Sequence, residues 1–385
     1  MRPAPPDPAR VALLVGAPGV PVRGPSGASA HVRGVVAALQ RRLDARLFAV
    51  QEADSRGIFA EPVDAFYGGL PPWPRPMLRW RRYREVLAAR RLARALVEQS
   101  LSGGWSPALL LERHSLYSDA GLQVADRLGL PWLLEVNAPA VDERAQVEEL
   151  RAPREARRWE RGVLMAAPRV VAPSRALCAW LEAGVGCRSV AWVPNGSDLP
   201  IGDRAAGRRA LGLTEDDVVV GFVGSMRPWH GVERLPAIAA ALGAVAVAVG
   251  AGATPAGVRA PGFLAGQSLA DAIAAFDLAV APTLPGSHGG FCPLKILDYR
   301  SQGVPVVGSD VGDAAVLIGE AGAVAPAAEL DGLIDLARQW TGRRTPVARR
   351  SWDRVVDDLL NVAAGRPTGT LFSEDVPRGA TEVAR

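Results

Sequence analysis

The sequence predicts an α/β protein built from two successive doubly wound parallel sheets. Short runs rich in Val, Leu and Ala alternate with longer helical patterns, which is typical of βαβ units. The alternation starts again near Val218, after a cluster of turn residues. With 385 residues, the chain is long enough for two such domains, each with its own core.

The first half contains six apolar runs of strand length with helical patterns between them. The predicted strands are 11–15, 47–50, 108–111, 132–136, 169–172 and 191–193, and the predicted helices include 30–43, 81–98 and 143–164. The second half continues with predicted strands at 218–223, 244–249, 278–281 and 304–307. In sheets of this kind, ligands bind beyond the carboxyl ends of the strands.

Turn residues following Val193 predict the join between the domains. We place an N-terminal Rossmann-like domain at 1–198 and a C-terminal Rossmann-like domain at 199–346. The pattern 347–364, which includes Trp352, predicts a helix that crosses back to the first domain. The small, polar and charged residues 365–385 predict a disordered tail.

Composition argues against several classes of protein. Three scattered cysteines fit neither a disulfide framework nor a zinc site, so we expect a cytoplasmic protein. A net charge of +4, without a basic run interleaved with aromatics, argues against nucleic acid as a partner. The longest uncharged stretch, 235–258, is interrupted by Pro236, Gly243, Gly250 and Gly252, so we expect no transmembrane helix.

The basic stretch 75–84 has two interpretations. A solvated helix face is the simpler one. Peripheral contact with the inner face of a membrane, or with an anionic acceptor, is the alternative.

The segment 289–299 has the residues expected of a phosphate site. It follows a predicted strand and opens a predicted helix, with Pro293 suited to the first helical turn. Glycines there let the backbone approach a ligand, and the free N–H groups of a helix start favour a phosphate. Lys295, the only lysine in the chain, is placed to reach the same anion, and Asp298 to bind two ribose hydroxyls. The alternative is a loop that only turns the chain.

A second strand-to-helix loop, 224–231, follows the strand 218–223. Its Arg227 is suited to bidentate contact with a diphosphate, and His230 to a further hydrogen bond. A packing role for Trp229 and a solvated Arg227 are the simpler interpretation. Two cationic loops at one sheet edge favour the anion site.

The first domain has similar loops at 24–32, 112–115 and 135–139. The glycines in 24–32 do not have the dinucleotide-binding spacing, which argues against an oxidoreductase. All four histidines of the chain lie in strand-to-helix loops, but their separations show no metal-ligand pattern. We therefore expect them to form hydrogen bonds rather than to bind a metal.

Taken together, these segments resemble the bacterial family 4 (group 1) glycosyltransferases of the GT-B fold, in which two Rossmann-like domains face each other across a cleft. The similarity covers roughly Val11 to Ala364. Single segments are weak evidence, but their order and spacing are specific. The matching segments are 27–32, 112–116, 134–139 with Glu143, 171–174, 193–196, 224–232, 292–299 and 303–307.

The resemblance implies retaining transfer from a nucleoside diphosphate sugar, with neither a cofactor nor an obligatory metal. It also implies that 1–198 is the acceptor-side domain and that 199–346 is the nucleotide-sugar-binding domain. Arg227 takes the place of the family's phosphate-binding arginine, and His230 stands where a lysine is usual. Asp298 matches the glutamate that holds the ribose. The family's other glutamate, which contacts the sugar, would fall on Gly290; a subgroup with a Pro-Leu-Lys pattern also lacks it, so we expect a variant site.

The resemblance also assigns roles to individual residues. We expect His114, which matches a histidine near the reacting sugar, to act in catalysis together with Arg227 and Lys295. On the acceptor side we expect His31, Arg113, Glu135 and Asn137. The expected donor contacts are Gly27, Ala28, Arg227, His230, Gly290, Phe291, Cys292, Pro293, Leu294, Lys295 and Asp298.

Two other functions stay open at this point. One is a non-catalytic subunit that binds nucleotide sugar and supports an active partner, and the other is a sugar-nucleotide epimerase. The residues do not identify the base, the sugar or the acceptor, which could be a glycan, a lipid-linked molecule or a small molecule.

Overall fold

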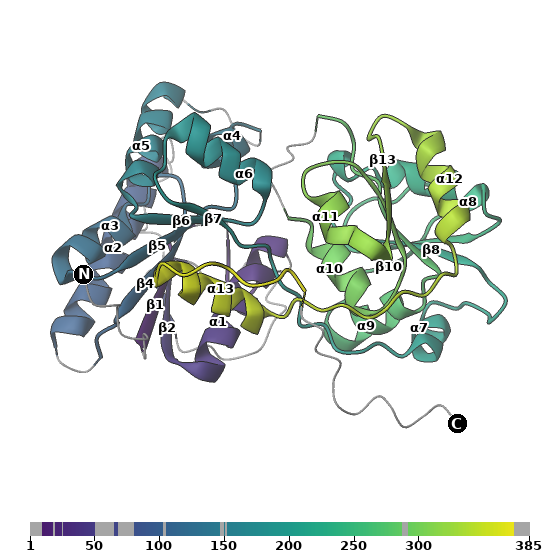
Figure 1. The fold of residues 1–385 in the computed structure, drawn as a ribbon, viewed down its shortest axis with the longest axis horizontal. Coiled ribbons are helices and arrows are strands. Elements are labelled where there is room, and N and C mark those ends of the chain that lie inside the picture. The colour runs from purple at the N-terminus through teal and green to yellow at the C-terminus, as the bar shows by residue number, and fades with distance from the viewer. Residues whose placement is uncertain are drawn as a thin grey trace. The chain divides into compact units, whose positions relative to one another are not determined.

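A computed structural model of the chain describes residues 10–17, 20–24, 26–50, 65–67, 81–102, 105–146, 150, 152–286 and 292–372. The described residues form two compact units (Figure 1). The first unit comprises residues up to Asn195 together with Trp352–Gly369. The second comprises Gly196–Ser351 together with the residues from Thr370 onward.

The first unit is built on a parallel sheet of seven strands, counted over the described residues. Its order is β3-β2-β1-β4-β5-β6-β7, so the direction of winding reverses between β1 and β4. The strands are β1 (Arg10–Val15), β2 (Asp44–Ala49), β3 (Ala65–Tyr67), β4 (Leu109–Arg113), β5 (Trp132–Glu135), β6 (Arg169–Ala172) and β7 (Val190–Trp192).

Helices cover both faces of this sheet (Figure 1). One face carries α2 (Arg81–Leu101), α3 (Ala120–Leu128) and α5 (Pro153–Ala166), which pack on fully buried side chains such as Leu14, Leu110 and Leu134. The other face carries α1 (Gly27–Arg42) and α13 (Trp352–Ala363), from which Val35 and Leu359 meet the strand residue Leu111.

Helix α13 is fitted closely to α1. Any side chain at Gly34 would overlap the indole ring of Trp352, so glycine lets the two helices approach each other. Two ion pairs extend the contact along the helices, Arg41 to Asp353 at 2.8 Å and Arg42 to Asp357 at 2.6 Å.

The second unit repeats the plan, with the order β10-β9-β8-β11-β12-β13 among the described strands. Winding reverses here between β8 and β11. The strands are β8 (Val219–Val223), β9 (Val245–Val249), β10 (Arg259–Gly262), β11 (Leu278–Ala281), β12 (Val306–Ser309) and β13 (Gly322–Ala325). All pairs in both sheets are parallel.

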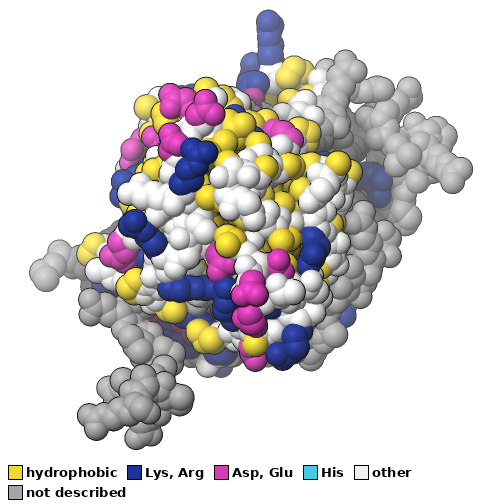
Figure 2. Space-filling model, turned by 90° about the vertical axis from the view of Figure 1, so that its right-hand side faces the viewer, with side chains coloured by type: hydrophobic (Ala, Val, Ile, Leu, Met, Phe, Trp, Pro, Cys, Tyr) yellow, Lys and Arg dark blue, Asp and Glu magenta, His cyan; other side chains and the backbone are white. Residues whose placement is uncertain are grey.

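Two hydrophobic clusters flank this second sheet. One includes α9 (Gly266–Ala274), α10 (Leu294–Ser301) and α11 (Ala314–Ile318). The other includes α8 (Leu235–Ala240) and α12 (Leu330–Trp340). No helix among those described is both long and apolar enough to span a bilayer. Figure 2 shows the face that lies on the right in Figure 1. On the described surface of this face, acidic and basic side chains are intermingled, without an extended basic patch.

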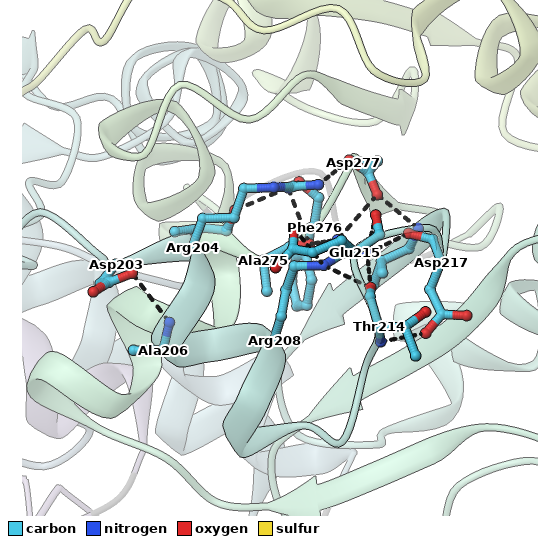
Figure 3. A network of polar contacts seen from close by, with 12 residues as sticks. Asp203, Arg204, Ala206, Arg208, Thr214, Glu215, Asp217, Ala275, Phe276 and Asp277 are labelled. Atoms are coloured by element: carbon cyan, nitrogen blue, oxygen red, sulfur yellow. Dashed lines mark hydrogen bonds and ion pairs between the residues drawn. The ribbon is translucent and has the colours of Figure 1, made fainter.

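A network around two arginines, of which Arg208 is buried, fixes the start of the second unit (Figure 3). Arg204 and Arg208 lie on α7 (Arg204–Ala210) and donate to carbonyl oxygens at the C-terminal end of α9, including that of Ala275. Arg204 also pairs with Asp277 at 2.7 Å. Arginine at this end of a helix is favourable, because the last carbonyl groups carry partial negative charge.

All ten predicted strands overlap observed strands, and the parallel architecture is confirmed. The prediction missed β3, β10 and β13, which are all edge strands. Strand β10 reads Arg-Ala-Pro-Gly and β13 reads Gly-Ala-Val-Ala, so neither shows a run of β-branched residues.

Three details of the predicted helices and tail were wrong. The stretch 143–164 is not one helix, because α4 (Ala140–Ala145) ends early and Pro153 starts α5. The last helix starts at Trp352 rather than at 347. Residues 365–372 are held in place, since the amide of Gly369 donates to Asp358 at 2.7 Å and the Phe372 ring lies 3.9 Å from the guanidinium carbon of Arg300. The rest of the tail lies outside the described residues.

Candidate active site

In the second unit, the loops after β8 and β11 meet where the winding reverses. The amide of Leu284 donates to the carbonyl of Trp229 at 3.0 Å. Gly231 has φ of 69°, and a side chain there would overlap the carbonyl of Pro282. Glycine is therefore required both by the backbone conformation and by the close approach of the second loop.

Lys295, Arg227 and His230 converge beside these loops. Lys295 lies in the first turn of α10, and its Nζ is 4.1 Å from the centre of the Phe222 ring. A methyl group at Gly224 would lie 3.1 Å from this Nζ and 3.5 Å from Nδ1 of His230. The guanidinium carbon of Arg227 lies 5.8 Å from the centre of the Trp229 ring.

The electrostatics of this cluster favour an anion. Burial lowers the pKa of Lys295 to about 7. Burial, the charge of Lys295 and the charge of Arg227 together lower the pKa of His230 to about 4. Within the described part of the chain, no carboxylate forms an ion pair with Arg227 or Lys295. A bound anion would offset both the burial of Lys295 and the effect of the Lys295 and Arg227 charges on His230.

His230 has a defined proton arrangement in this state. Its Nδ1 contacts the carbonyl oxygen of Ser225, so the neutral ring carries its proton on Nδ1. Its Nε2 becomes a donor only when the ring takes up a second proton. The sequence predicts a hydrogen bond from His230 to a phosphate. In this arrangement Nε2 would have to donate it, which requires proton uptake on binding.

Asp298 lies one helical turn after Lys295, as the sequence predicts. The hydroxyl of Ser197 donates to Asp298 Oδ1 at 2.6 Å, and burial raises the pKa of Asp298 to about 6. The next residue, Tyr299, is fully buried, and its hydroxyl accepts from the amide of Val223 at 2.7 Å. Tyr299 thereby joins α10 to the end of β8. Sequence reasoning missed both Ser197 and Tyr299.

The other predicted donor residues lie around the start of α10. Leu294 is the first helical residue, and Pro293 is the residue before it rather than part of the first turn. The side chain of Cys292 is buried in the core, which leaves only its backbone for a ligand. Gly290 and Phe291 lie outside the described residues.

In the first unit, three predicted acceptor-side residues form one hydrogen-bonded group. Arg113 Nη1 donates to His31 Nδ1 at 3.1 Å, and His31 Nε2 donates to Glu135 Oε1 at 2.6 Å. Burial would raise the pKa of Glu135, but His31, Arg113 and Asn137 outweigh it and hold this pKa below its ordinary value. Glu135 is thus an ionised, partly exposed carboxylate at the carboxyl edge of the sheet.

His114 is separate from this group. Its amide donates to the carbonyl of Glu135 at 2.7 Å, while its side chain is only 2% exposed. The ring Nε2 lies 3.6 Å from Glu160 Oε1, and neither ring nitrogen has a hydrogen-bond partner among the described residues. Glu160, which the sequence did not single out, also accepts from the amide of Ala140 at 2.6 Å.

Gly27 and Ala28 form the first turn of α1. The helix is capped by Ser26, whose hydroxyl accepts from the amide of Ser29 at 3.1 Å. The two residues therefore follow β1, next to which the strand order of the first sheet reverses. In the described part of the chain, no group of three or more His, Cys, Asp or Glu side chains is suited to hold a metal ion.

Two family models match the chain, and each covers one of these sites. The model "Glycosyltransferase Family 4" matches residues 25–200, and the model "Glycosyl transferases group 1" matches residues 217–341. The chain belongs to glycosyltransferase family 4. The candidate site of each unit, where the strand order reverses, therefore lies within a region that matches a family model.

Curated relatives of this family 4 chain include D-inositol 3-phosphate glycosyltransferases from Mycobacterium bovis and Mycobacterium tuberculosis. Each is 30% identical over 226 residues, which covers 49% of this chain and 46% of the relative. The chain spans about half the length of the curated relatives it matches.

Solved structures with the same fold confirm the GT-B architecture. Sucrose-phosphate synthase from Thermosynechococcus elongatus has a TM-score of 0.64 at 19% identity and covers 92% of this chain and 94% of its own. Anabaena HepE, in complex with UDP-glucose, has a TM-score of 0.59 at 15% identity and covers 92% and 99%. At these identities the similarity supports the fold alone.

Proposed function

We propose that this chain is a retaining glycosyltransferase that moves a sugar from a nucleoside diphosphate sugar to an acceptor. The second unit provides most of the donor contacts, and the first unit binds the acceptor. The observation that carries the proposal is the convergence of Arg227, His230 and Lys295, without a paired carboxylate among the described residues, where the strand order reverses.

The proposed roles in the second unit follow from charge and reach. Arg227 and Lys295 bind the pyrophosphate, together with the free amides at the start of α10. Asp298, oriented by Ser197, accepts hydrogen bonds from the ribose. When the sugar leaves, negative charge develops on the diphosphate, and prearranged cations stabilise it. Because the family resemblance implies no obligatory metal, these protein cations supply the compensating charge.

The proposed roles in the first unit concern the acceptor and the reacting sugar. Glu135, held ionised by His31 and Arg113, is suited to accept a hydrogen bond from an acceptor hydroxyl. Asn137 follows it in the same loop. We place His114 next to the transferred sugar, and Gly27 and Ala28 beside the donor phosphates. These assignments combine the observed geometry with the roles that the family resemblance implies.

Thermal unfolding in the presence of nucleotides tests donor binding. UDP and UDP-glucose are the first probes, because HepE, which has the same fold, is described with UDP-glucose; GDP and ADP and their glucose derivatives complete the panel. We expect one base to raise the Tm, since a ligand that binds only the folded state stabilises it. Failure of every nucleoside diphosphate to raise the Tm would contradict a donor site.

Variants then connect binding with transfer. We expect Arg227→Ala and Lys295→Ala each to lose transfer activity while the unliganded Tm stays within a few degrees of wild type. Arg343→Ala, at an exposed position without an assigned role, is the matched control. Near-native transfer rates in both site variants would overturn the phosphate assignment.

A non-catalytic role is the second candidate. Gly290 stands where the family's sugar-contacting glutamate is expected, and His230 stands where a lysine is usual. A protein of this kind would bind the nucleotide sugar but release neither free nucleotide nor transferred sugar. Measuring nucleoside diphosphate release with and without a panel of acceptors distinguishes the two, and isomerised sugar nucleotide would instead identify an epimerase.

A further inference from the structure

Glu112 is a carboxylic acid in the hydrophobic interior of the first unit. It lies on β4, level with Leu14 of β1 and Leu134 of β5, and both leucines are fully buried. Glu112 itself is 1% exposed, and no cation pairs with it among the described residues. Burying an unpaired carboxyl group is costly, so a role beyond packing is expected.

The carboxyl group of Glu112 connects β4 to the loop and helix that follow. The hydroxyl of Ser118 donates to its Oε1 at 3.1 Å. Its Oε2 lies directly over the backbone of Gly121 on α3, where any side chain would overlap it. Glu112 therefore contacts both the end of the 114–119 loop and the first turn of α3.

The loop 114–119, which joins β4 to α3, is strained. Tyr117 has φ of 66° and is the only residue other than glycine with positive φ in the described part of the chain. For a bulky residue this conformation is unfavourable by about 1 kcal/mol or more and persists only when neighbouring contacts enforce it. Ser118, the next residue, provides such contacts, because its amide donates to the carbonyl of Ser115 and its hydroxyl to Glu112.

The loop also carries His114 and passes the end of β1. A methyl group at Gly16 would lie 2.7 Å from the hydroxyl oxygen of Ser118, so the loop is closely fitted where the strand order reverses. We propose that Glu112 is a positioning residue that holds the strained 114–119 loop through Ser118 and so sets the orientation of the His114 ring. The catalytic consequence rests on the proposed function of His114.

The strength of the hydrogen bond from Ser118 to Glu112 depends on the ionisation of Glu112. Burial raises the pKa of this carboxyl group to about 7, and the nearby charge of Asp119 adds to the shift. The other groups that face it, Ser118 of the loop, Gly121 of α3 and Trp132 of β5, are neutral. An ionised carboxylate is the stronger acceptor, so the Ser118 hydrogen bond strengthens as pH rises through 7.

NMR of the full chain tests the positioning role without a substrate. The protein has four histidines, so His114→Gln assigns the His114 imidazole resonances directly. We compare Ser118→Ala, which deletes the hydrogen bond, and Glu112→Gln, which keeps the shape but cannot ionise. The control is Ser102→Ala, which removes an exposed serine hydroxyl at the end of α2.

We expect Ser118→Ala to shift the His114 resonances and to accelerate amide hydrogen exchange in 114–119 by at least about tenfold. Glu112→Gln should abolish the pH-dependent shift of the Tyr117 and Ser118 amides between pH 6 and 8. Ser102→Ala should change neither. Unchanged His114 resonances and exchange rates in Ser118→Ala, or an unchanged amide titration in Glu112→Gln, would overturn the proposal.

Donor turnover separates this proposal from the proposed function. If His114 is catalytic, Ser118→Ala should lower kcat for transfer with little change in donor KM, because most of the proposed donor contacts lie in the other unit. If His114→Gln keeps wild-type turnover, the role of His114 is wrong, while the NMR result still decides whether Glu112 holds the loop.

Discussion

Burial and a bound anion shift the pKa of the Lys295 ammonium group in opposite directions. Burial lowers the pKa of Lys295 to about 7. Near that pH, Lys295 is therefore neutral in about half of the ligand-free molecules. In the unliganded state the charged form costs stability, and that cost falls as pH rises from about 7 towards the ordinary value of 10.5. A diphosphate favours the charged form and raises the pKa again.

This opposition predicts a pH-dependent affinity. Through Lys295, the affinity for UDP should weaken by up to about tenfold per pH unit above pH 7, until the pKa of the bound state is reached. Isothermal titration calorimetry between pH 6 and 9 measures this slope. Lys295→Met should bind more weakly and lose the slope, and an equal slope in both proteins would place the titrating group elsewhere.

Asp298 and Arg227 should be distinguishable by the part of the ligand that each binds. Asp298→Ala should weaken UDP binding by about tenfold or more, the range expected when a hydrogen bond to a charged group is lost, but leave pyrophosphate binding unchanged. Arg227→Ala should weaken both. Competition titrations with UDP and pyrophosphate provide the comparison. Equal losses for both ligands in Asp298→Ala would remove it from the ribose site.

At the scale of elements, α7 depends on buried hydrogen bonds rather than on apolar packing alone. Arg208 is 1% exposed, and its guanidinium donates to carbonyls of Thr214, Asp217 and Ala275 (Figure 3). Its removal would take a donor from each of these carbonyls and would remove a buried cation that lies 3.6 Å from Asp277. Such losses are among the larger effects of single substitutions.

We therefore expect Arg208→Ala to lower the free energy of unfolding by about 3 kcal/mol or more. Arg209→Ala, at the exposed neighbouring position of the same helix, should change it by less than about 0.5 kcal/mol. Urea denaturation followed by circular dichroism measures both. Similar transition midpoints for the two variants would show that the network in Figure 3 contributes little.

The elements also show which parts of the molecule a sequence can predict. Central strands such as 278–281 are buried on both faces and therefore read as apolar runs, whereas the edge strands β10 and β13 do not. Lys295 and Arg227 could be predicted because loop, helix start and cation are neighbours in sequence. Ser197 could not, since it meets Asp298 across 101 positions and has no local pattern. The strain at Tyr117 likewise follows only from the path of the folded chain.

At the scale of the whole molecule, each unit has its own sheet and core, so a defect in one should leave the other able to bind its ligand. Gly34→Leu tests this, because its side chain would displace Trp352 and loosen α13 from α1. We expect a lower Tm and a largely retained UDP affinity, because most of the proposed donor contacts lie in the second unit. Gly162→Leu, at an open position on α5, is the control. Loss of UDP binding in Gly34→Leu would show that the units are energetically coupled.

The division of the chain has a practical consequence. Since the first unit takes residues up to Asn195 and then Trp352–Gly369, the polypeptide changes unit three times, and neither unit is one continuous stretch of gene. Truncation at residue 195 would strip α1 of its partner and leave an apolar surface prone to aggregation. An isolated first unit would need α13 fused through a new linker or supplied as a separate peptide.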